Sequence, residues 1–407
     1  PPYHGLKKYV ESSAAPAIVT FVIIFVGING NVAGDAAFVV LPPVAGVIFL
    51  GMGRHPLLGV FCGYASVAAG FCANIMLGMS DSLAYGFTEA AARMINPAYM
   101  ASPAINYYFL VASCVVLSIA GTIVTEKFMA PRFAGQDLIK YELDSEALHL
   151  TSQKSKAVTA ACIATVVALL ILLGLSLGEQ PILGDPKTGS IMDGKSPFMV
   201  GIILTVTMVL FVPGTVYGFV SGKYKNDKDL WADVSQAFKD ISSYILLCFF
   251  CAQFTSYFAW SNLGAVLAIK GAGLLKEMSF TGVPLIIGLM LVSCIVNIFI
   301  GSASAKWAIL APVMVPMMMI LGYDPAITQA AYRIGDSITN PLSPLFYYFP
   351  LILGFVRRYE KDTGMGTIIA NMLPYSICFT ICWIVLLIVW VVFNLPLGPG
   401  GSVYLPH

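Results

Sequence analysis

The chain has 407 residues, of which 58% are hydrophobic and only 11% are charged. Soluble globular chains are roughly half apolar and roughly a quarter charged, so this composition excludes that class. Lys and Arg number 22 against 21 Asp and Glu, which leaves no positive field to hold DNA or RNA. The composition therefore indicates a polytopic membrane protein that lies in a lipid bilayer and has no nucleic-acid partner.

Apolar runs of about twenty residues predict membrane-spanning helices. Their length favours helices over the short alternating segments of an outer-membrane barrel. In chain order, the expected spans are 57–90, 104–125, 157–177, 198–221, 241–262, 326–353 and 366–394. Two further apolar regions, 16–50 and 282–320, are too long for one span, and each is interrupted midway by small and polar residues. The expected fold class is an all-α, multi-pass membrane protein.

The distribution of basic residues predicts how these segments cross the membrane, because Lys and Arg accumulate in short cytoplasmic loops. The loops rich in basic residues, expected in the cytoplasm, are 126–156, 222–240 and 354–365. The loops poor in basic residues, expected outside, are 91–103 and 178–197. The spans fit this assignment only if the first interrupted region enters and leaves from the cytoplasm and the second from the outside. We therefore predict two re-entrant hairpins of opposite orientation.

The two hairpins align with each other at an offset of 269 residues, which places Pro43 on Pro312. The same offset carries the long span and the span after it onto their counterparts in the second half. Because the hairpins open to opposite sides, the two units have inverted topology, which is typical of alternating-access transporters with a midplane site. The spans 198–221 and 241–262 precede the second unit without counterparts, so two N-terminal helices are expected to be missing.

The predicted organisation has three parts. Residues 1–125 form the first inverted repeat, with its hairpin, its broken span and one further span. Residues 126–197 contain a cytoplasmic loop, the linking span and an external loop. Residues 198–407 form the second inverted repeat, with two leading spans before its hairpin, its broken span and the last span.

Each long span is interrupted by residues that disrupt a helix. In the second unit the interruption is 337–344, which contains two prolines without an N–H donor, and in the first it is 69–74. Irregular backbone at membrane depth survives only inside protein or along an aqueous cavity. The breaks and hairpin tips therefore offer carbonyls, hydroxyls and amides to a cation and helix N-termini to an anion. The alternative is a proline kink whose backbone groups are satisfied locally.

Charged residues inside the hydrocarbon are costly and are therefore candidates for a functional site. Arg333 and Asp336 lie three residues apart on one predicted span, so they can pair on one helix face. In a functional role, Arg333 holds a substrate carboxylate while Asp336 exchanges a proton or ligates a cation. In a structural role, they form a locked ion pair. Asp81 and Asp35 are the other acids expected to be buried.

Two residues at the tip of the second hairpin leave alternatives open. Lys306 either neutralises Asp336 or faces water. Trp307 either stacks on an aromatic ring or anchors the hairpin at the membrane interface. Zinc-protease motifs are absent from the sequence and its histidines lie at ends and in loops, so we expect no enzyme and no cofactor. Paired hairpins and buried ion pairs suit an occluding carrier better than a channel.

Several stretches resemble one known family. They are SNLGAVLAIKGAGLL, GSASAKWAILAPVMVPM, GYDPAITQAAYRIGDSITNPLSPL, NVAGDAAFVVLPP and ANIMLGMSD. In these stretches and over nearly its whole length, the sequence resembles the AbgT family of p-aminobenzoyl-glutamate transporters. The resemblance implies a homodimer of nine-helix protomers in a bacterial inner membrane, each with two re-entrant hairpins. It also implies transport of p-aminobenzoyl-glutamate, and some members are proposed to export sulfonamide drugs.

The resemblance further implies which residues form the site, and all of these residue types are present. They are Asp81, Asn297, Ser304, Trp307, Pro325, Arg333, Asp336 and Pro344. p-Aminobenzoyl-glutamate offers two carboxylates, for Arg333 and the hairpin N-termini, and an aromatic ring, for Trp307. Uphill import of a dianion into a negative cell requires co-transported Na⁺ or H⁺.

We also expect a Na⁺ site, because carboxylate, amide and hydroxyl oxygens suit a hard cation. Its expected ligands near Asp336 are Asn297, Ser302, Asn340 and Ser343. The residues expected to mirror them in the first unit are Asn31, Asp35 and Asn74. The rival hypothesis is a proton antiporter in which Asp336 and Asp81 carry the proton. A sodium-coupled symporter of another dicarboxylate and a channel-like anion conductor are the alternative functions.

Overall fold

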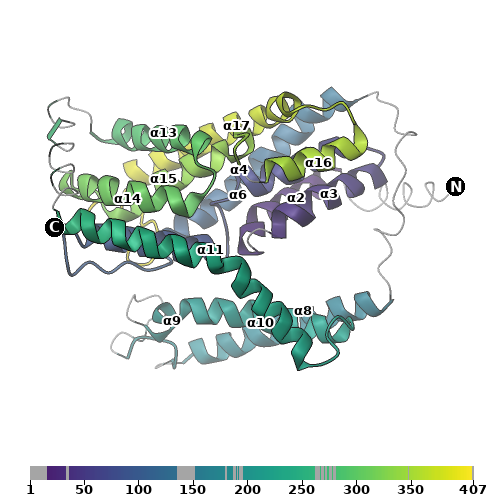
Figure 1. Cartoon of the computed structure of the whole chain (residues 1–407), viewed down its shortest axis with the longest axis horizontal. Helices are drawn as coiled ribbons and strands as arrows, with labels where there is room; N and C mark the ends of the chain where they lie inside the picture. The colour runs from purple at the N-terminus through teal and green to yellow at the C-terminus, as the bar shows by residue number, and fades with distance from the viewer. Residues whose placement is uncertain are drawn as a thin grey trace. The chain divides into compact units, whose positions relative to one another are not determined.

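The computed structural model describes residues 16–33, 36–134, 152–178, 181–186, 189, 191, 196–261, 266, 270, 273–274, 277, 281–346 and 348–405. Within these residues the regular structure is helical apart from isolated β-bridges, which confirms the all-α prediction (Figure 1). The chain divides into two units, Pro1–Leu143 with Phe258–His407, and Asp144–Tyr257. We refer to these as the larger and the smaller unit.

The larger unit contains two series of helices. The first series is α2 (Pro16–Asn29), η1 (Gly30–Ala33), α3 (Ala36–Gly51), α4 (Pro56–Ala69), α5 (Met79–Ala92), α6 (Tyr107–Ile123), η2 (Val124–Met129) and η3 (Ala130–Phe133). The second series is α13 (Val283–Phe299), α14 (Ala303–Ile320), α15 (Pro325–Thr339), η4 (Asn340–Leu342), α16 (Phe349–Tyr359) and α17 (Met365–Val392). Each series consists of a helical hairpin, a helix in two pieces, and a long helix, so the predicted hairpins and broken helices are present.

The two series follow the sequence offset closely. α4 begins at Pro56 and α15 begins at Pro325, which are 269 residues apart. The turn before each contains a glycine with positive φ, 71° at Gly53 and 89° at Gly322. L side chains rarely adopt this conformation, so both turns require glycine. The local turn geometry thus recurs together with the order of the helices.

The helix breaks differ in position from those expected. α15 continues through Ser337 to Thr339, and the first break runs from Gly70 to Gly78. Ser337 and Thr339 donate their hydroxyls to carbonyls four residues earlier, at 2.8 and 2.9 Å, so these polar residues are accommodated within the helix. The helix ends where Pro341 can no longer donate a backbone hydrogen bond.

The two pieces named α4 and α15 form the centre of the larger unit. Every residue of α4 is buried, and so is every residue of α15 from Pro325 to Ile338. α15 nevertheless carries Arg333 and Asp336, so these charges face other protein groups instead of lipid. The broken helices therefore place charged side chains in the interior.

Within the described residues, four helical segments are long and apolar enough to cross a membrane. They are Tyr107–Phe133, Ser152–Ser176, Ala303–Ile320 and Met365–Val392. Shorter apolar helices include Pro16–Asn29, Pro56–Ala69 and Val283–Phe299. Helices shorter than a full span are what hairpin arms and half-helices require.

The close crossing of α13 and α15 gives a test of the packing. A Cβ atom at Gly335 would lie 2.4 Å from the Met290 carbonyl oxygen and 2.7 Å from the Ser293 Cβ. Small residues allow membrane helices to approach in this way. We expect Gly335→Val to lower the free energy of unfolding by roughly 1–3 kcal/mol through overpacking.

Thermal unfolding of the purified protein in detergent measures this effect. Gly354→Ala is the matched control, because a Cβ there meets no atom within 4 Å. Equal unfolding midpoints for the Gly335 and Gly354 variants would contradict the observed crossing.

The C-terminal segment packs on the turn before α15. The Asp324 N–H donates to the Val403 carbonyl at 3.0 Å, and the Leu405 N–H donates to the Gly322 carbonyl at 3.0 Å. The Asp324 carboxylate accepts hydrogen bonds from the Ala326 N–H at 2.8 Å and the Ser402 hydroxyl at 3.4 Å. Asp324 thus caps α15 and helps to hold the C-terminal segment in place.

Burial raises the pKa of Asp324 from 3.8 to about 6, against the opposing effect of its hydrogen bonds. The folded protein then holds this proton more tightly than the unfolded chain. The contribution to stability is complete below pH 3.8 and is lost as the pH rises through about 6. We expect Asp324→Asn, which retains a capping oxygen, to flatten this part of the pH dependence of thermal unfolding. An unchanged slope in the variant would contradict the assignment.

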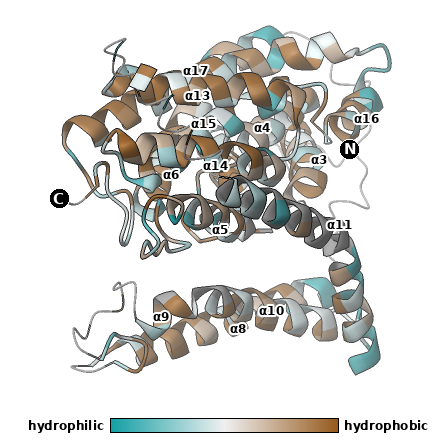
Figure 2. Cartoon of the chain, turned by 60° about the vertical axis from the view of Figure 1, so that its left-hand side comes forward, coloured by the Kyte–Doolittle hydropathy of each residue, from teal (hydrophilic) through white to brown (hydrophobic). Residues whose placement is uncertain are grey.

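The smaller unit contains α8 (Ser152–Ser176), α9 (Pro197–Val200), α10 (Ile202–Val220) and most of α11 (Asp227–Trp260). α8 and α10 pack on each other, and both are largely hydrophobic along their length (Figure 2). Apolar side chains such as Ile163 and Leu170 are exposed on α8. A helix that is apolar all round and exposed suits a lipid environment.

The units group the spans differently from the three predicted parts. α8 and α10 belong to one unit, whereas the sequence-based division separates them at residue 197. The expected span 241–262 is the C-terminal portion of α11, a helix of 34 residues that begins in the preceding loop. Hydropathy detects only the apolar part of such a helix, because its first turns are polar.

Candidate transport site

Two buried ion pairs lie in the interior of the larger unit. Arg333 Nη1 lies 2.6 Å from Asp81 Oδ1, and these side chains are 3% and 0% exposed. Lys306 Nζ pairs with Asp336 Oδ1, and these side chains are 0% and 1% exposed. Burying a charge without a partner costs several kcal/mol, and pairing offsets this cost. The four formal charges cancel.

The Arg333–Asp81 pair connects the two series of helices in the larger unit. We call the first series, α2 to η3, its first half and the second series, α13 to α17, its second half. Asp81 lies in the first turn of α5, where its Oδ2 accepts hydrogen bonds from the Gly78 N–H at 2.6 Å and from Asn74 Nδ2 at 3.0 Å. A carboxylate at a helix N-terminus is stabilised by the free backbone N–H groups there. Arg333 reaches this carboxylate from the middle of α15. The first break is therefore held in place by a charge from the second half.

Arg333 and Asp336 do not pair with each other, although both lie on α15. Each pairs with a residue from a different helix, Arg333 with Asp81 of α5 and Asp336 with Lys306 of α14. Both α5 and α14 pack against α15, and each supplies one partner. Of the two alternatives for Lys306, the structure shows the one in which it neutralises Asp336.

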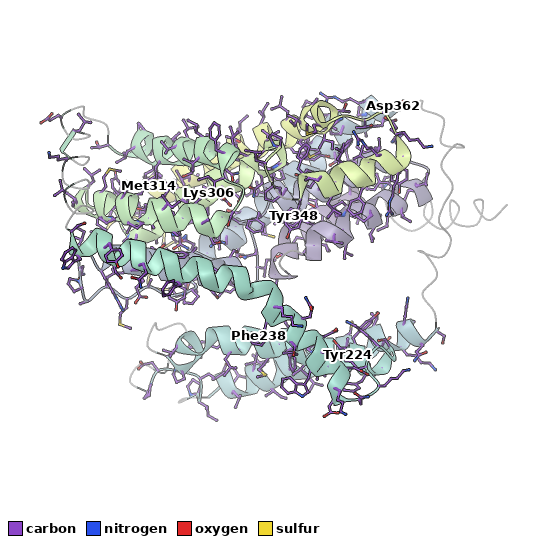
Figure 3. The ribbon with its side chains drawn as sticks, in the orientation of Figure 1. Tyr224, Phe238, Lys306, Met314, Tyr348 and Asp362 are labelled. Carbon is purple, nitrogen blue, oxygen red and sulfur yellow. The ribbon has the colours of Figure 1, made fainter. Side chains whose placement is uncertain are left out.

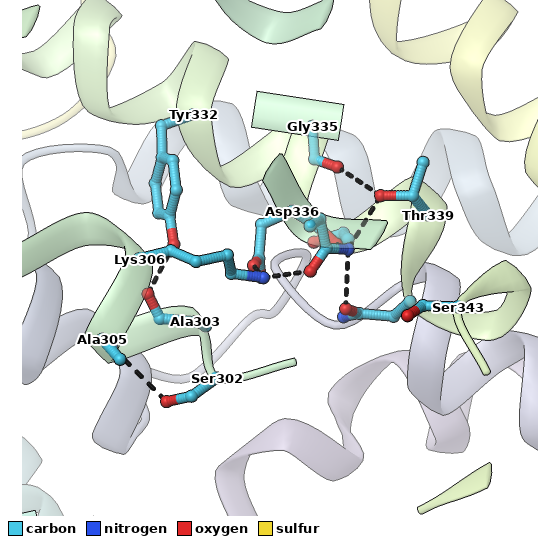
Figure 4. A network of polar contacts seen from close by, with 12 residues as sticks. Ser302, Ala303, Ala305, Lys306, Tyr332, Gly335, Asp336, Thr339 and Ser343 are labelled. Atoms are coloured by element: carbon cyan, nitrogen blue, oxygen red, sulfur yellow. Dashed lines mark hydrogen bonds and ion pairs between the residues drawn. The ribbon is translucent and has the colours of Figure 1, made fainter. Parts of the chain in front are cut away.

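A directed chain of hydrogen bonds leads from Lys306 to the first half. Figure 4 shows Lys306 reaching from α14 to Asp336 on α15. Its ammonium also donates to Asn297 Oδ1. Asn297 Nδ2 donates to the Asp336 carbonyl at 2.6 Å and to Asn340 Oδ1 at 3.0 Å. Asn340 Nδ2 lies 3.4 Å from the Ala68 carbonyl in the last turn of α4. The hairpin and both broken helices are thereby linked.

Trp307 is buried against both halves. Its indole N–H lies 2.9 Å from the Thr88 hydroxyl of α5, and its ring stacks on Tyr332 with centroids 4.3 Å apart. The Thr88 hydroxyl lies 2.9 Å from Gln329 Oε1. The Tyr332 hydroxyl in turn donates to the Ala303 carbonyl. Trp307 thus sits in the interior of the unit, next to the ion pairs.

The remaining predicted residues lie at helix ends. Ser302 caps α14 by accepting from the Ala305 N–H at 3.4 Å, and its hydroxyl lies 3.3 Å from that of Ser304. Ser343 donates to the Ile298 carbonyl at 3.0 Å. Pro325 is the first residue of α15, where its missing N–H is tolerated, and Pro344 lies in the second break.

The expected cation ligands meet only in part. Asn297 and Asn340 are in contact, but the cation beside Asn297 is the Lys306 ammonium. In the first half, Asn74 hydrogen-bonds to Asp81. The side chain of Asn31 and all of Asp35 lie outside the described residues.

Several buried polar atoms lack a hydrogen-bond partner among the described residues. Those closest to the ion pairs include Arg333 Nη2, Gln329 Nε2, Asn74 Oδ1 and Asp336 Oδ2. A buried group without a partner costs about 1–3 kcal/mol, so a ligand that satisfies it gains affinity. The free donors suit a carboxylate or carbonyl oxygen, and the free acceptors suit a cation or a proton.

Two residues of this arrangement were not predicted from the sequence, Gln329 and Thr88. Gln329 lies four residues before Arg333, so it shares the same helix face one turn away. That spacing could have indicated it as a second donor. Thr88 has no sequence signal of this kind, because its partners come from distant segments.

Comparison with known proteins identifies the family. The sequence pattern of the AbgT transporter family matches residues 4–405. The chain belongs to the AbgT family. It is 35% identical over 399 residues to the p-aminobenzoyl-glutamate transport protein of Escherichia coli (strain K12), covering 97% of this chain and 77% of that protein.

Solved structures of transporters show the same fold. The YdaH transporter of Alcanivorax borkumensis is 38% identical with a TM-score of 0.89, over 97% of this chain and 82% of that one. MtrF of Neisseria gonorrhoeae, from a class of antimetabolite efflux pumps, is 37% identical with a TM-score of 0.86, over 96% and 78%. This AbgT protein is therefore an integral membrane transporter and not an enzyme, as the sequence predicts.

Proposed function

We propose that this AbgT protein is a secondary active carrier of p-aminobenzoyl-glutamate. The single observation that carries the proposal is the buried Arg333 guanidinium, which pairs with Asp81 yet keeps Nη2 without a hydrogen-bond partner among the described residues. A guanidinium with a free N–H can bind a substrate carboxylate by a charge-assisted hydrogen bond. The identity to the Escherichia coli p-aminobenzoyl-glutamate transport protein supports this choice of substrate.

The groups around Arg333 match the other parts of p-aminobenzoyl-glutamate. Gln329 Nε2 is a second donor without a hydrogen-bond partner among the residues that the structure describes, and it suits the amide carbonyl or a second carboxylate oxygen. Trp307 and Tyr332 place stacked aromatic rings beside the ion pairs, where a benzoyl ring can pack. Binding then requires the substrate carboxylate to share Arg333 with Asp81, which weakens a contact between the two halves.

That contact gives a physical basis for alternating access. The Arg333–Asp81 pair and the Asn340 contact with Ala68 both join the first half of the larger unit to the second. A substrate that competes for Arg333 changes the relative stability of the arrangements of the two halves. Inverted repeats that move against each other around a midplane site are the basis of many carriers.

Transport of a dianion against the membrane potential needs coupling to an ion. Each negative charge moved inward costs roughly 2.3 kcal/mol per 100 mV. We propose coupling to Na⁺ or H⁺, with Asp336 and Asp81 as the acids available to a proton. Oxygen ligands near the breaks are available to Na⁺. A location in a bacterial inner membrane and a homodimeric assembly belong to the same proposal.

A second candidate function is drug export. MtrF, at 37% identity over 96% of this chain, represents antimetabolite efflux pumps. Sulfonamides resemble the p-aminobenzoyl group in carrying an aromatic amine opposite an acidic or polar substituent. They lack the glutamate carboxylates, so they would use the aromatic contacts more than Arg333.

Equilibrium binding tests the proposed substrate. Labelled p-aminobenzoyl-glutamate is expected to bind the purified protein saturably, and unlabelled p-aminobenzoyl-glutamate should compete at least about ten times better than a simple dicarboxylate or a sulfonamide. Gly354→Ala is the control variant and should bind normally. Stronger competition by another dicarboxylate or by the sulfonamide would replace the proposed substrate with that compound.

A further inference from the structure

We propose that Lys306 is the resident cation of the second hairpin. Its ammonium occupies the position where an exchangeable monovalent cation would otherwise bind, and a small neutral side chain at this position opens a cation site. Figure 3 labels Lys306 on α14. This role deepens the carrier function proposed above and rests on it.

The surroundings of the ammonium are those of a cation site. Lys306 Nζ contacts a carboxylate oxygen of Asp336 and the amide oxygen of Asn297, and the side chain is 0% exposed. Carboxylate and amide oxygens are the ligand types that hard monovalent cations take in proteins. A second carboxylate oxygen, Asp336 Oδ2, has no hydrogen-bond partner among the described residues. The oxygens therefore converge on one positive charge.

The orientation of Asn297 does not depend on Lys306. Asn297 Nδ2 lies 2.6 Å from the Asp336 carbonyl, 2.7 Å from Thr339 Oγ1 and 3.0 Å from Asn340 Oδ1. These acceptors fix the amide nitrogen on one side, so the amide oxygen faces the ammonium. Removing the lysine side chain would leave this oxygen and the Asp336 carboxylate directed at the same space.

Comparison of the two repeats shows that Lys306, Asn297 and Asp336 occur together in the second half and are all replaced in the first. At the offset of 269 residues, Lys306, Asn297 and Asp336 correspond to Ala37, Ile28 and Val67. These three counterparts are buried apolar residues. The second half thus contains a cation, a carboxylate and an amide together, whereas the first half has none of the three at the matching positions. The charge of Asp336 is compensated from within its own half.

This role of Lys306 argues against the predicted Na⁺ site beside Asp336 and Asn297. With the ammonium in place, Asn297 Oδ1 and the Asp336 carboxylate are already bound to a cation. A second positive charge beside them would be repelled and would leave the buried charges unbalanced. In the wild type, the site formed by Asn297 Oδ1 and the Asp336 carboxylate therefore accepts no alkali cation, and a coupling ion must bind elsewhere or be a proton.

Cation-dependent stability tests the proposal without measuring transport. Thermal unfolding of purified Lys306→Ala is compared with that of the wild type and of Lys306→Arg in NaCl, KCl, ethylammonium chloride and choline chloride at equal ionic strength. We expect Na⁺ or ethylammonium to raise the midpoint of Lys306→Ala saturably, by at least about 3 °C more than that of the wild type. Lys306→Arg keeps the positive charge and should respond as the wild type does.

A second variant keeps the experiment decisive if Lys306→Ala is unstable. Lys306→Met with Asp336→Asn removes both charges, so it should fold and show no added response to Na⁺ or ethylammonium. Recovery of folded Lys306→Ala only in Na⁺ or ethylammonium supports the proposal. An equal response of Lys306→Ala and the wild type overturns it, as does failure of Lys306→Ala to fold in every salt while the double variant folds. Binding of p-aminobenzoyl-glutamate to the wild type is measured separately, so a wrong substrate remains distinguishable from a wrong cation site.

Discussion

Replacing Arg333 by methionine is expected to lower p-aminobenzoyl-glutamate transport by at least about 100-fold, because the proposed charge-assisted contact to the substrate carboxylate would be lost. It is also expected to lower the free energy of unfolding by roughly 3–5 kcal/mol, because Asp81 is left buried without its partner. Transport is measured by uptake into proteoliposomes, and stability by thermal unfolding of the same preparation.

The double variant Arg333→Met with Asp81→Asn separates the two effects. Neutralising Asp81 removes the unpaired charge, so most of the lost stability should return. Transport should remain low, because the substrate still lacks its cationic partner. A double variant that regains normal transport would show that Arg333 only balances Asp81 and does not bind the substrate.

Replacing Trp307 by alanine is expected to cost roughly 3–5 kcal/mol of stability, because a buried indole and its packing are removed. Trp307→Phe keeps a ring against Tyr332 but loses the N–H contact with Thr88, so its cost should be nearer 1 kcal/mol. Both variants are measured by thermal unfolding and by binding of labelled p-aminobenzoyl-glutamate, whose affinity should fall more for alanine than for phenylalanine.

Trp231→Ala is the control for removing a tryptophan. Trp231 lies on α11 and is 62% exposed, so its loss should change stability by less than about 0.5 kcal/mol. If Trp307→Ala were as mild as Trp231→Ala, Trp307 would not support the packing of α14 on α5.

The arrangement of helices could be predicted because a membrane requires long apolar segments, which are easily recognised in a sequence. Long apolar runs, the placement of basic loops and the recurrence of Pro43 at Pro312 together indicated hairpins and broken helices. The cost of burying charge also indicated Arg333, Asp336 and Asp81 as candidates. These inferences use the sequence and the properties of the bilayer alone, and they need no knowledge of tertiary contacts.

The pairing of the charges could be predicted only in part, because the sequence left the Lys306–Asp336 pair as one of two alternatives and gave no sign of the Arg333–Asp81 pair. Spacing on α15 allowed Arg333 to pair with Asp336, but α5 and α14 bring closer partners, Asp81 and Lys306. Helix ends were also displaced, because Ser337 and Thr339 are satisfied within the helix. The partner of a buried charge depends on which helices pack together, and helices that pack together can lie far apart in the sequence, as α5 and α15 do.

The most direct measurement is uptake of labelled p-aminobenzoyl-glutamate into proteoliposomes under an imposed Na⁺ or H⁺ gradient, with Asp336→Ala as the comparison. We predict accumulation above equilibrium under one of the two gradients, and loss of that accumulation in Asp336→Ala. Simple equilibration under both gradients, or accumulation that is unchanged in the variant, would contradict an ion-coupled carrier that works through this site.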